Sequence, residues 1–108
     1  MGLKARYQKA LDEFVNRVLE RFRNNIENII VFGSVARGEA REDSDIDVIV
    51  ITGNEDYKLR RSIISIAFDV FLDTGNNISV KVLSKDDFET HKNFSFLKKV
   101  VSEGVKVV

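Results

Sequence analysis

One stretch of the sequence, VFGSVARGEAREDSDIDVIV at residues 31–50, constrains the fold more strongly than any other. An apolar run stops at Gly33 and Ser34, a polar segment follows, and Asp45 and Asp47 then interrupt a second apolar run. Because alternate residues of a strand point to the same face, we expect the two carboxylates to share one face, with Cα atoms roughly 6.6–7 Å apart. Two such carboxylates can hold a hard divalent cation such as Mg²⁺, so the pattern favours a cation site over a solvated edge strand with ordinary charges.

The Gly33-Ser34 pair predicts the second half of such a site. Glycine lets the backbone approach a ligand closely, and a short helix over residues 34–40, with Ser34 as its N-cap, would offer free N–H groups to a phosphate. The connection from Phe32 to Asp45 is short for a parallel crossover, so we expect the two strands to be antiparallel neighbours. The glycine, the serine and the two aspartates then meet at one end of the sheet, where they form a site for a metal-bound nucleoside triphosphate.

The remaining chain alternates between helical and strand patterns. Ser84, with Asp87 three residues later, is typical of a helix start. We expect one α/β (α+β) domain over 1–108, a small mixed sheet of three or four strands with packed helices. The expected order is a helix over 3–23, a strand over 26–32, the short helix over 34–40, a strand over 45–52, a helix over 55–71, a strand over 78–83, and a helix that breaks near Asn93, resumes at Ser95 and stops at Gly104 before a short strand over 105–108.

Composition narrows the classes of function. The chain of 108 residues carries 17 Lys+Arg and 17 Asp+Glu. This balance disfavours a protein that binds nucleic acid mainly through electrostatic attraction, unless a local basic patch exists. It contains no Cys, which excludes disulfides, thiolate zinc sites and cysteine nucleophiles. No apolar run approaches the ~20 residues of a membrane span, so we expect a cytoplasmic protein with no membrane partner.

The stretch GSVARGEAREDSDIDVIV resembles the minimal nucleotidyltransferases of the DNA polymerase β-like superfamily. Their signature is a Gly-Ser, a polar gap and an Asp-x-Asp flanked by apolar residues, and the ARG and SD here are similar to the small prokaryotic branch. The resemblance implies a nucleotidyltransferase fold and transfer of a nucleoside monophosphate from a nucleoside triphosphate, with ATP expected, to a hydroxyl. It also implies that Gly33 and Ser34 hold the terminal phosphates and that Asp45 and Asp47 are catalytic residues that bind Mg²⁺.

Arg37 and the strand over 78–84 leave two questions open. Arg37 is either a phosphate contact or a structural ion-pair partner of Glu39 or Asp43. The family usually carries a third carboxylate on the later strand, but ISVKVLS presents Ser79 and Lys81 on its polar face instead. The alternative function is therefore a catalytically weak or inactive module that binds a nucleotide or a partner.

The acceptor and the partners are open as well. Small members of this family often resemble the antitoxin half of a pair with a helical HEPN-type partner, and some modify that partner. A helical HEPN-type protein is thus one partner that the resemblance allows. Association of the chain with further copies of itself is also left open. We expect His91, the only histidine, to have a surface or packing role rather than a catalytic one.

Overall fold

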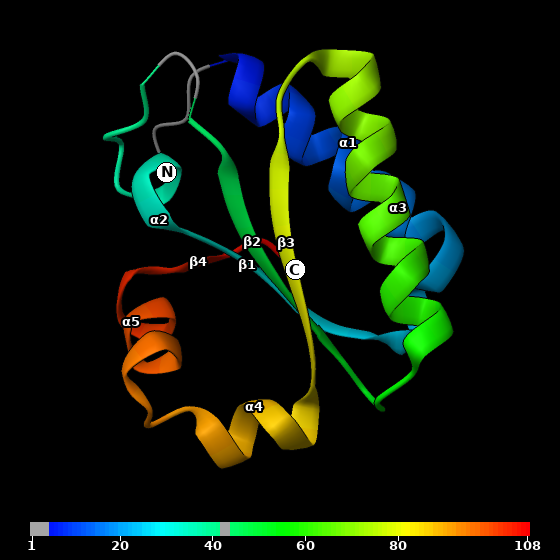
Figure 1. Ribbon diagram of the computed structural model, residues 1–108, viewed down its shortest axis with the longest axis vertical. Coiled ribbons are helices and arrows are strands. Elements are labelled where there is room, and N and C mark those ends of the chain that lie inside the picture. Colours follow the sequence, from blue (N-terminus) through cyan, green and yellow to red (C-terminus); the bar gives the residue numbers. More distant parts are fainter. Residues whose placement is uncertain (1–4, 42–43) are drawn as a thin grey trace.

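The computed structural model describes residues 5–41 and 44–108, which fold around one four-stranded sheet (Figure 1). β1 is antiparallel to both β2 and β4, whereas β2 and β3 are parallel, so the expected mixed sheet is confirmed. The order across the sheet is β3-β2-β1-β4, which makes β2 an interior strand and contradicts the alternative of a solvated edge strand. The strands are β1 Ile26–Phe32, β2 Ile46–Thr52, β3 Ile78–Ser84 and β4 Val105–Lys106.

Helices lie on both faces of this sheet. In Figure 1, α1 and α3 lie side by side to the right of the strands, while α4 and α5 lie below and to the left. No helix within the two described ranges is both long enough and apolar enough to cross a membrane. The helices are α1 Ala5–Phe22, α2 Gly33–Ala36, α3 Tyr57–Thr74, α4 Lys85–His91 and α5 Ser95–Glu103, with a 3₁₀ turn, η1, at Arg23–Asn25.

The side chains of β2 alternate between two hydrophobic cores. Val48 is buried with α1 and α3 in the larger core, whereas Ile49 is buried in a smaller core with Leu97 of α5. Because alternate residues of a strand share a face, Asp47 lies on the same face as Ile49. The sheet therefore directs its aspartate away from the main core and toward the side that α5 partly covers.

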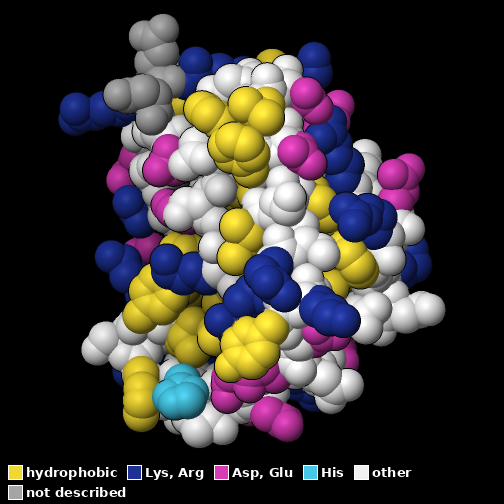
Figure 2. Space-filling view, turned by 45° about the vertical axis from the view of Figure 1, so that its right-hand side comes forward, with side chains coloured by type: hydrophobic (Ala, Val, Ile, Leu, Met, Phe, Trp, Pro, Cys, Tyr) yellow, Lys and Arg dark blue, Asp and Glu magenta, His cyan; other side chains and the backbone are white. Residues whose placement is uncertain are grey.

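The two long helices are fixed by their apolar faces and by their ends. Asp56 is the N-cap of α3, and its carboxylate accepts hydrogen bonds from Lys58 N at 2.9 Å and Leu59 N at 3.1 Å. Gly75, with φ 77°, ends the helix, so α3 begins and ends later than the expected 55–71. Figure 2 turns the right-hand side of Figure 1 forward and shows hydrophobic side chains at the surface there, among Lys and Arg side chains. The buried face of α1 consists of Tyr7, Ala10, Leu11, Phe14 and Val18.

The C-terminal segment agrees with the expected helix, break, helix and strand. The Ser84 hydroxyl accepts a hydrogen bond from Asp87 N at 3.1 Å and so caps α4. After the interruption, α5 begins at Ser95 and is followed by Gly104 and β4. The chain then pairs with β1, which is not an edge strand because of this addition.

Candidate functional site

The end of β1 and the start of β2 meet at Gly33 and Asp47. Phe32, the last residue of β1, is the partner of Asp47 in the antiparallel ladder. Gly33 has a φ of +75° and lies so close to the Asp47 side chain that a Cβ would overlap Oδ2 and lie 3.1 Å from Cγ. Both the left-handed backbone and the lack of space require glycine here. The structure thus brings the Gly-Ser turn and the Asp-x-Asp strand together.

The helix after β1 begins earlier and is shorter than expected. α2 spans Gly33–Ala36, and its N-cap is Phe32, so the predicted 34–40 helix with Ser34 as N-cap is wrong. The glycine's left-handed conformation turns the strand directly into the helix, which leaves Ser34 inside the first turn. None of the described residues hydrogen-bonds to the Ser34 hydroxyl. This hydroxyl and the first N–H groups of α2, which have no acceptor within the helix, are free to meet a ligand.

Asp45 and Asp47 form a concentration of negative charge at the start of β2. Asp47 is partly buried, whereas Asp45 precedes the strand by one residue and is exposed, so the strand starts one residue later than expected. Burial raises the pKa of Asp47, and the neighbouring Asp45 charge raises it further, while Lys81 and Arg37 act in the opposite direction. The environment therefore disfavours the ionised form of Asp47, a condition that a bound cation would relieve.

β3 brings no carboxylate to this pair. The parallel register places Ser79 beside Asp47 and Lys81 beside Ile49. Within residues 5–41 and 44–108, no three His, Cys, Asp or Glu side chains gather closely enough to hold a metal ion together. The donor set still fits Mg²⁺, because this ion is usually bound through one or two carboxylates and keeps waters and substrate phosphates as its other ligands.

Arg37 takes part in two ion pairs at the C-terminal end of α2. Its guanidinium lies 3.1 Å from a Glu39 carboxylate oxygen and 3.1 Å from one of Glu103, and these hydrogen bonds raise its pKa. Of the readings that the sequence left open, the pair with Glu39 is present, whereas Asp43 lies outside the described residues. The same guanidinium is near enough to Asp47 to influence the pKa of that carboxyl.

Residues 11–107 match the model of the nucleotidyltransferase domain family. The chain belongs to this family. One relative is the Methanocaldococcus jannaschii protein named "Putative protein adenylyltransferase MJ0604", which is 37% identical over 97 residues. That match covers 90% of this chain and 93% of the relative, so nearly the whole of each sequence is compared.

Solved structures agree with this assignment. A structure named "putative minimal nucleotidyltransferase" is 28% identical, with a TM-score of 0.56, and the match covers 90% of this chain and 92% of that one. A structure named "putative nucleotidyltransferase from Sulfolobus solfataricus" (23% identity, TM-score 0.55, 91% of this chain and 76% of that one) shows the same fold. So does a toxin–antitoxin structure with AMP-PNP (19% identity, TM-score 0.57, 88% and 70%).

In this nucleotidyltransferase, α5 adds residues to the Gly33 turn that sequence reasoning missed. The Phe96 ring meets the Phe32 ring edge to face, with centroids 5.6 Å apart. No local motif could have indicated this, because α5 is distant in sequence from the Gly33 turn. A hollow of about 190 Å³ results, lined by Phe32, Gly33, Arg37, Phe96, Lys99, Val100 and Glu103.

A second, more apolar hollow of about 380 Å³ lies along β3 on the same face of the sheet as Asp47. Lys81 is at its edge, with its ammonium 5.6 Å from the centroid of the Phe96 ring. His91 packs edge to face on Phe94 at 5.2 Å, the packing role expected for the only histidine. The lining residues are Lys81, Leu83, His91, Phe94, Phe96 and Leu97.

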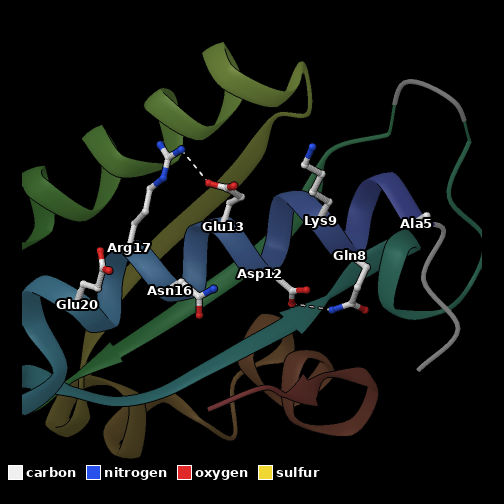
Figure 3. Close-up of a pocket in the computed structure, with 8 residues that line it drawn as sticks. All are labelled: Ala5, Gln8, Lys9, Asp12, Glu13, Asn16, Arg17 and Glu20. Atoms are coloured by element: carbon white, nitrogen blue, oxygen red, sulfur yellow. Dashed lines mark hydrogen bonds and ion pairs between the residues drawn. The ribbon is translucent and has the colours of Figure 1, made fainter.

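A further hollow, of about 640 Å³, lies along α1 and is less suited to binding, because its side chains pair within their own helix (Figure 3). Gln8 hydrogen-bonds to Asp12 at 2.9 Å, and Arg17 pairs with Glu13 at 2.8 Å, so these side chains stabilise their own helix. Arg17 also reaches Asp73 of α3 at 2.7 Å. All eight lining residues come from one helix, and they do not converge on a common point: Ala5, Gln8, Lys9, Asp12, Glu13, Asn16, Arg17 and Glu20.

Proposed function

We propose that this nucleotidyltransferase transfers an adenylyl group from ATP, in a Mg²⁺-dependent reaction, to a hydroxyl of a protein acceptor. Family membership supports nucleotidyl transfer, and the name of the Methanocaldococcus jannaschii relative supports an adenylyl group and a protein acceptor. The single observation that supports the proposal is the contact between Gly33 and Asp47, because it puts a carboxylate that could bind a metal beside the first turn of α2, whose N–H groups lack acceptors within the helix.

Each residue of the turn and the strand has a part in this proposal. Gly33 and Ser34 would hold the terminal phosphates, and Asp45 and Asp47 would hold Mg²⁺, which would supply positive charge to neutralise the triphosphate and the leaving pyrophosphate. The acceptor oxygen forms a bond to the α-phosphorus, and the bond from that phosphorus to the bridging oxygen of the β-phosphate breaks. Pyrophosphate leaves, and the hydroxyl proton passes to water. Arg37, if released from Glu39 or Glu103, would add a guanidinium to the same phosphates.

A second candidate function is binding of a nucleotide or a partner without turnover, as in the antitoxin half of a HEPN-type pair. Ser79 and Lys81 favour it, because β3 offers a hydroxyl and an ammonium where a third metal-binding carboxylate would be useful. Structural neighbours that include toxin–antitoxin complexes, one of them with AMP-PNP, are compatible with this candidate. The two functions share the same phosphate and metal site, so they differ in turnover and not in binding.

Calorimetric titration with α,β-methylene-ATP, which cannot release pyrophosphate, tests the shared site. We expect binding with Mg²⁺ and not with EDTA. Asp47→Asn should abolish binding, and Ser34→Ala should weaken it by only about 0.5–1.5 kcal/mol, because the hydroxyl is one donor among several. Asp69→Asn, at an exposed position of α3, is the matched control. Equal affinity with and without EDTA would contradict the metal site.

Turnover separates the two functions. ATP labelled at the α-phosphate, incubated with Mg²⁺, the chain and an extract of its source cells, should transfer label to protein, and Asp47→Asn should prevent this. Binding with neither pyrophosphate release nor protein label would favour the second function.

A further inference from the structure

α3 carries a row of exposed apolar side chains on the side opposite its core face, interrupted by Arg61. Its inward residues, among them Ile63 and Val70, are buried. The outward residues form what we call the α3 stripe: Tyr57, Ile64, Phe68, Phe71 and Leu72, with exposed fractions of 68%, 46%, 58%, 39% and 64%. The Phe68 and Phe71 rings lie 6.4 Å apart. At 100° per residue these five positions fall within one third of the helix circumference, so the stripe runs straight along the helix.

Packing of the described chain gives no reason for this stripe. The exposed side of a surface helix is ordinarily polar, and a contiguous exposed apolar patch commonly marks an interaction site. The stripe follows a single helix, so its shape matches another helix lying along it. It faces away from the sheet, on the α1 side of the molecule, whereas Asp47 lies on the other face. A partner on the stripe would thus leave the Gly33–Asp47 site open.

The charges around the stripe indicate which helix fits. The first half of α3 carries Lys58, Arg60 and Arg61, and the second half carries Asp69 and Asp73. Arg60 lies 4.0 Å from Glu55, and Asp73 pairs with Arg17. Lys58, Arg61 and Asp69 form no ion pair with another described residue. A complementary helix would carry acidic residues opposite the first half of α3 and basic residues opposite the second half. The α3 helix of a second copy has this charge distribution when it runs in the opposite direction.

We propose that the α3 stripe is a self-association surface, on which a second copy of the chain packs its own α3 in antiparallel orientation. A two-fold axis near the middle of the helix brings Tyr57 toward Leu72 of the second copy and Arg61 toward Asp69 of the second copy, and each contact occurs twice. A parallel arrangement would place the basic halves together. Antiparallel packing also aligns the two helix dipoles favourably.

The size of the stripe sets the strength of this association. A helix of 18 residues is about 27 Å long, so one helix pair buries less than the ~800 Å² per partner of a typical stable interface. We therefore expect a dimer with a dissociation constant in the micromolar range, in exchange with monomer. Nucleotide binding should not depend on it, because the two surfaces lie on opposite faces of the sheet.

Sedimentation velocity over a concentration series from below to well above the micromolar range tests this proposal on the full chain. We expect a monomer–dimer equilibrium that Phe68→Asp shifts to monomer, raising the dissociation constant by about tenfold or more. Val101→Asp is the matched control, because Val101 is 57% exposed but lies on α5. Both positions are exposed, so circular dichroism should show unchanged folding. A chain that stays monomeric at every concentration, or a dimer unaffected by Phe68→Asp, would overturn the proposal.

Charge reversal tests the orientation and the identity of the partner. Arg61→Asp and Asp69→Arg should each weaken the dimer, because each places like charges together across the interface. The double variant should recover dimerisation, since only an antiparallel self-pair restores both contacts when both residues are exchanged. A double variant that remains as weak as the single ones would contradict antiparallel pairing of α3 with itself.

Discussion

The Asp47 carboxylate occupies the space that a side chain at residue 33 would fill. The Cβ that Gly33 lacks would overlap Oδ2 of Asp47, so the turn after β1 and the acid of β2 cannot be altered independently. Gly38 has the same φ of +75°, but nothing lies within 4 Å of where its Cβ would be. These two glycines therefore separate the effect of close approach from the effect of backbone conformation.

Alanine at each glycine should show this separation. Both Gly33→Ala and Gly38→Ala place a Cβ in the left-handed region, which costs about 1–2 kcal/mol. Gly33→Ala should lose more stability and should also lose Mg-ATP binding, because Asp47 must move. Urea unfolding and calorimetry measure the two quantities. Equal loss of stability in the two variants, with nucleotide affinity retained in both, would refute the importance of the contact.

The raised pKa of Asp47 predicts a pH-dependent loss of stability. As the pH rises from the ordinary carboxyl value of 3.8 toward the higher pKa in the folded chain, the unfolded chain releases its proton first, so folding becomes less favourable. Above the folded pKa the penalty is complete and constant. Asp47→Asn removes it, so in EDTA the variant should gain stability relative to the original chain from about pH 4 upward. Urea unfolding of both proteins across this pH range measures the difference, and an identical pH dependence in the two would contradict the prediction.

The two aspartates together should lower the stability of the fold when no metal is bound and should raise it when Mg-ATP is bound. We expect the double variant Asp45→Asn with Asp47→Asn to melt at the same or a higher temperature than the original in EDTA, because like charges no longer face each other. Mg-ATP at about 100 times its dissociation constant should add about 2.7 kcal/mol to the original and nothing to the variant. If the variant has a lower melting temperature than the original in EDTA, and Mg-ATP does not raise the melting temperature of the original, the aspartates are structural and the proposed site is wrong.

A carboxylate on β3 should increase turnover. Ser79 lies beside Asp47 in the parallel register, so Ser79→Asp would add a third oxygen donor next to the pair. We expect little or no pyrophosphate release from the original isolated chain, and more from Ser79→Asp at equal ATP. Ser65→Asp on the exposed side of α3 is the control for added charge. Rapid turnover of the original chain would show that two carboxylates are sufficient.

The part of the site formed by Gly33 and Asp47 could be predicted, because these residues lie close together in the sequence. The short connection between Phe32 and Asp45 requires antiparallel neighbours, and that pairing alone brings Gly33 to Asp47. The start of α2 could not be predicted in the same way. Ser34 has the residue type of an N-cap, but the left-handed glycine before it let the helix begin one residue earlier.

The part of the site that α5 contributes could not be predicted, for a different reason. Phe96 and Lys99 reach the Gly33 turn only because β4 pairs with β1 and carries α5 with it, and no spacing in the sequence indicates that pairing. α3 was predictable in part. Helical spacing groups one set of apolar residues on one face, and that face is buried: Leu59, Ile63, Ile66, Ala67 and Val70. The exposed position of Phe68 on the opposite side was visible only in three dimensions.

The pairing of β4 with β1 also sets the order in which the site can assemble. β1 and β2 close a short loop, whereas Asn28 and Val108, which are hydrogen-bonded, are 80 positions apart in the sequence. Loop-closure entropy favours the short loop, so we expect Gly33 and Asp47 to meet early in folding and α5 to arrive late. Pulse-labelling hydrogen exchange should then protect the amides of β2 before those of Val107 and Val108. During synthesis, the carboxylates would be in place before Val107 and Val108 have left the ribosome, while the α5 side of the hollow would still be open.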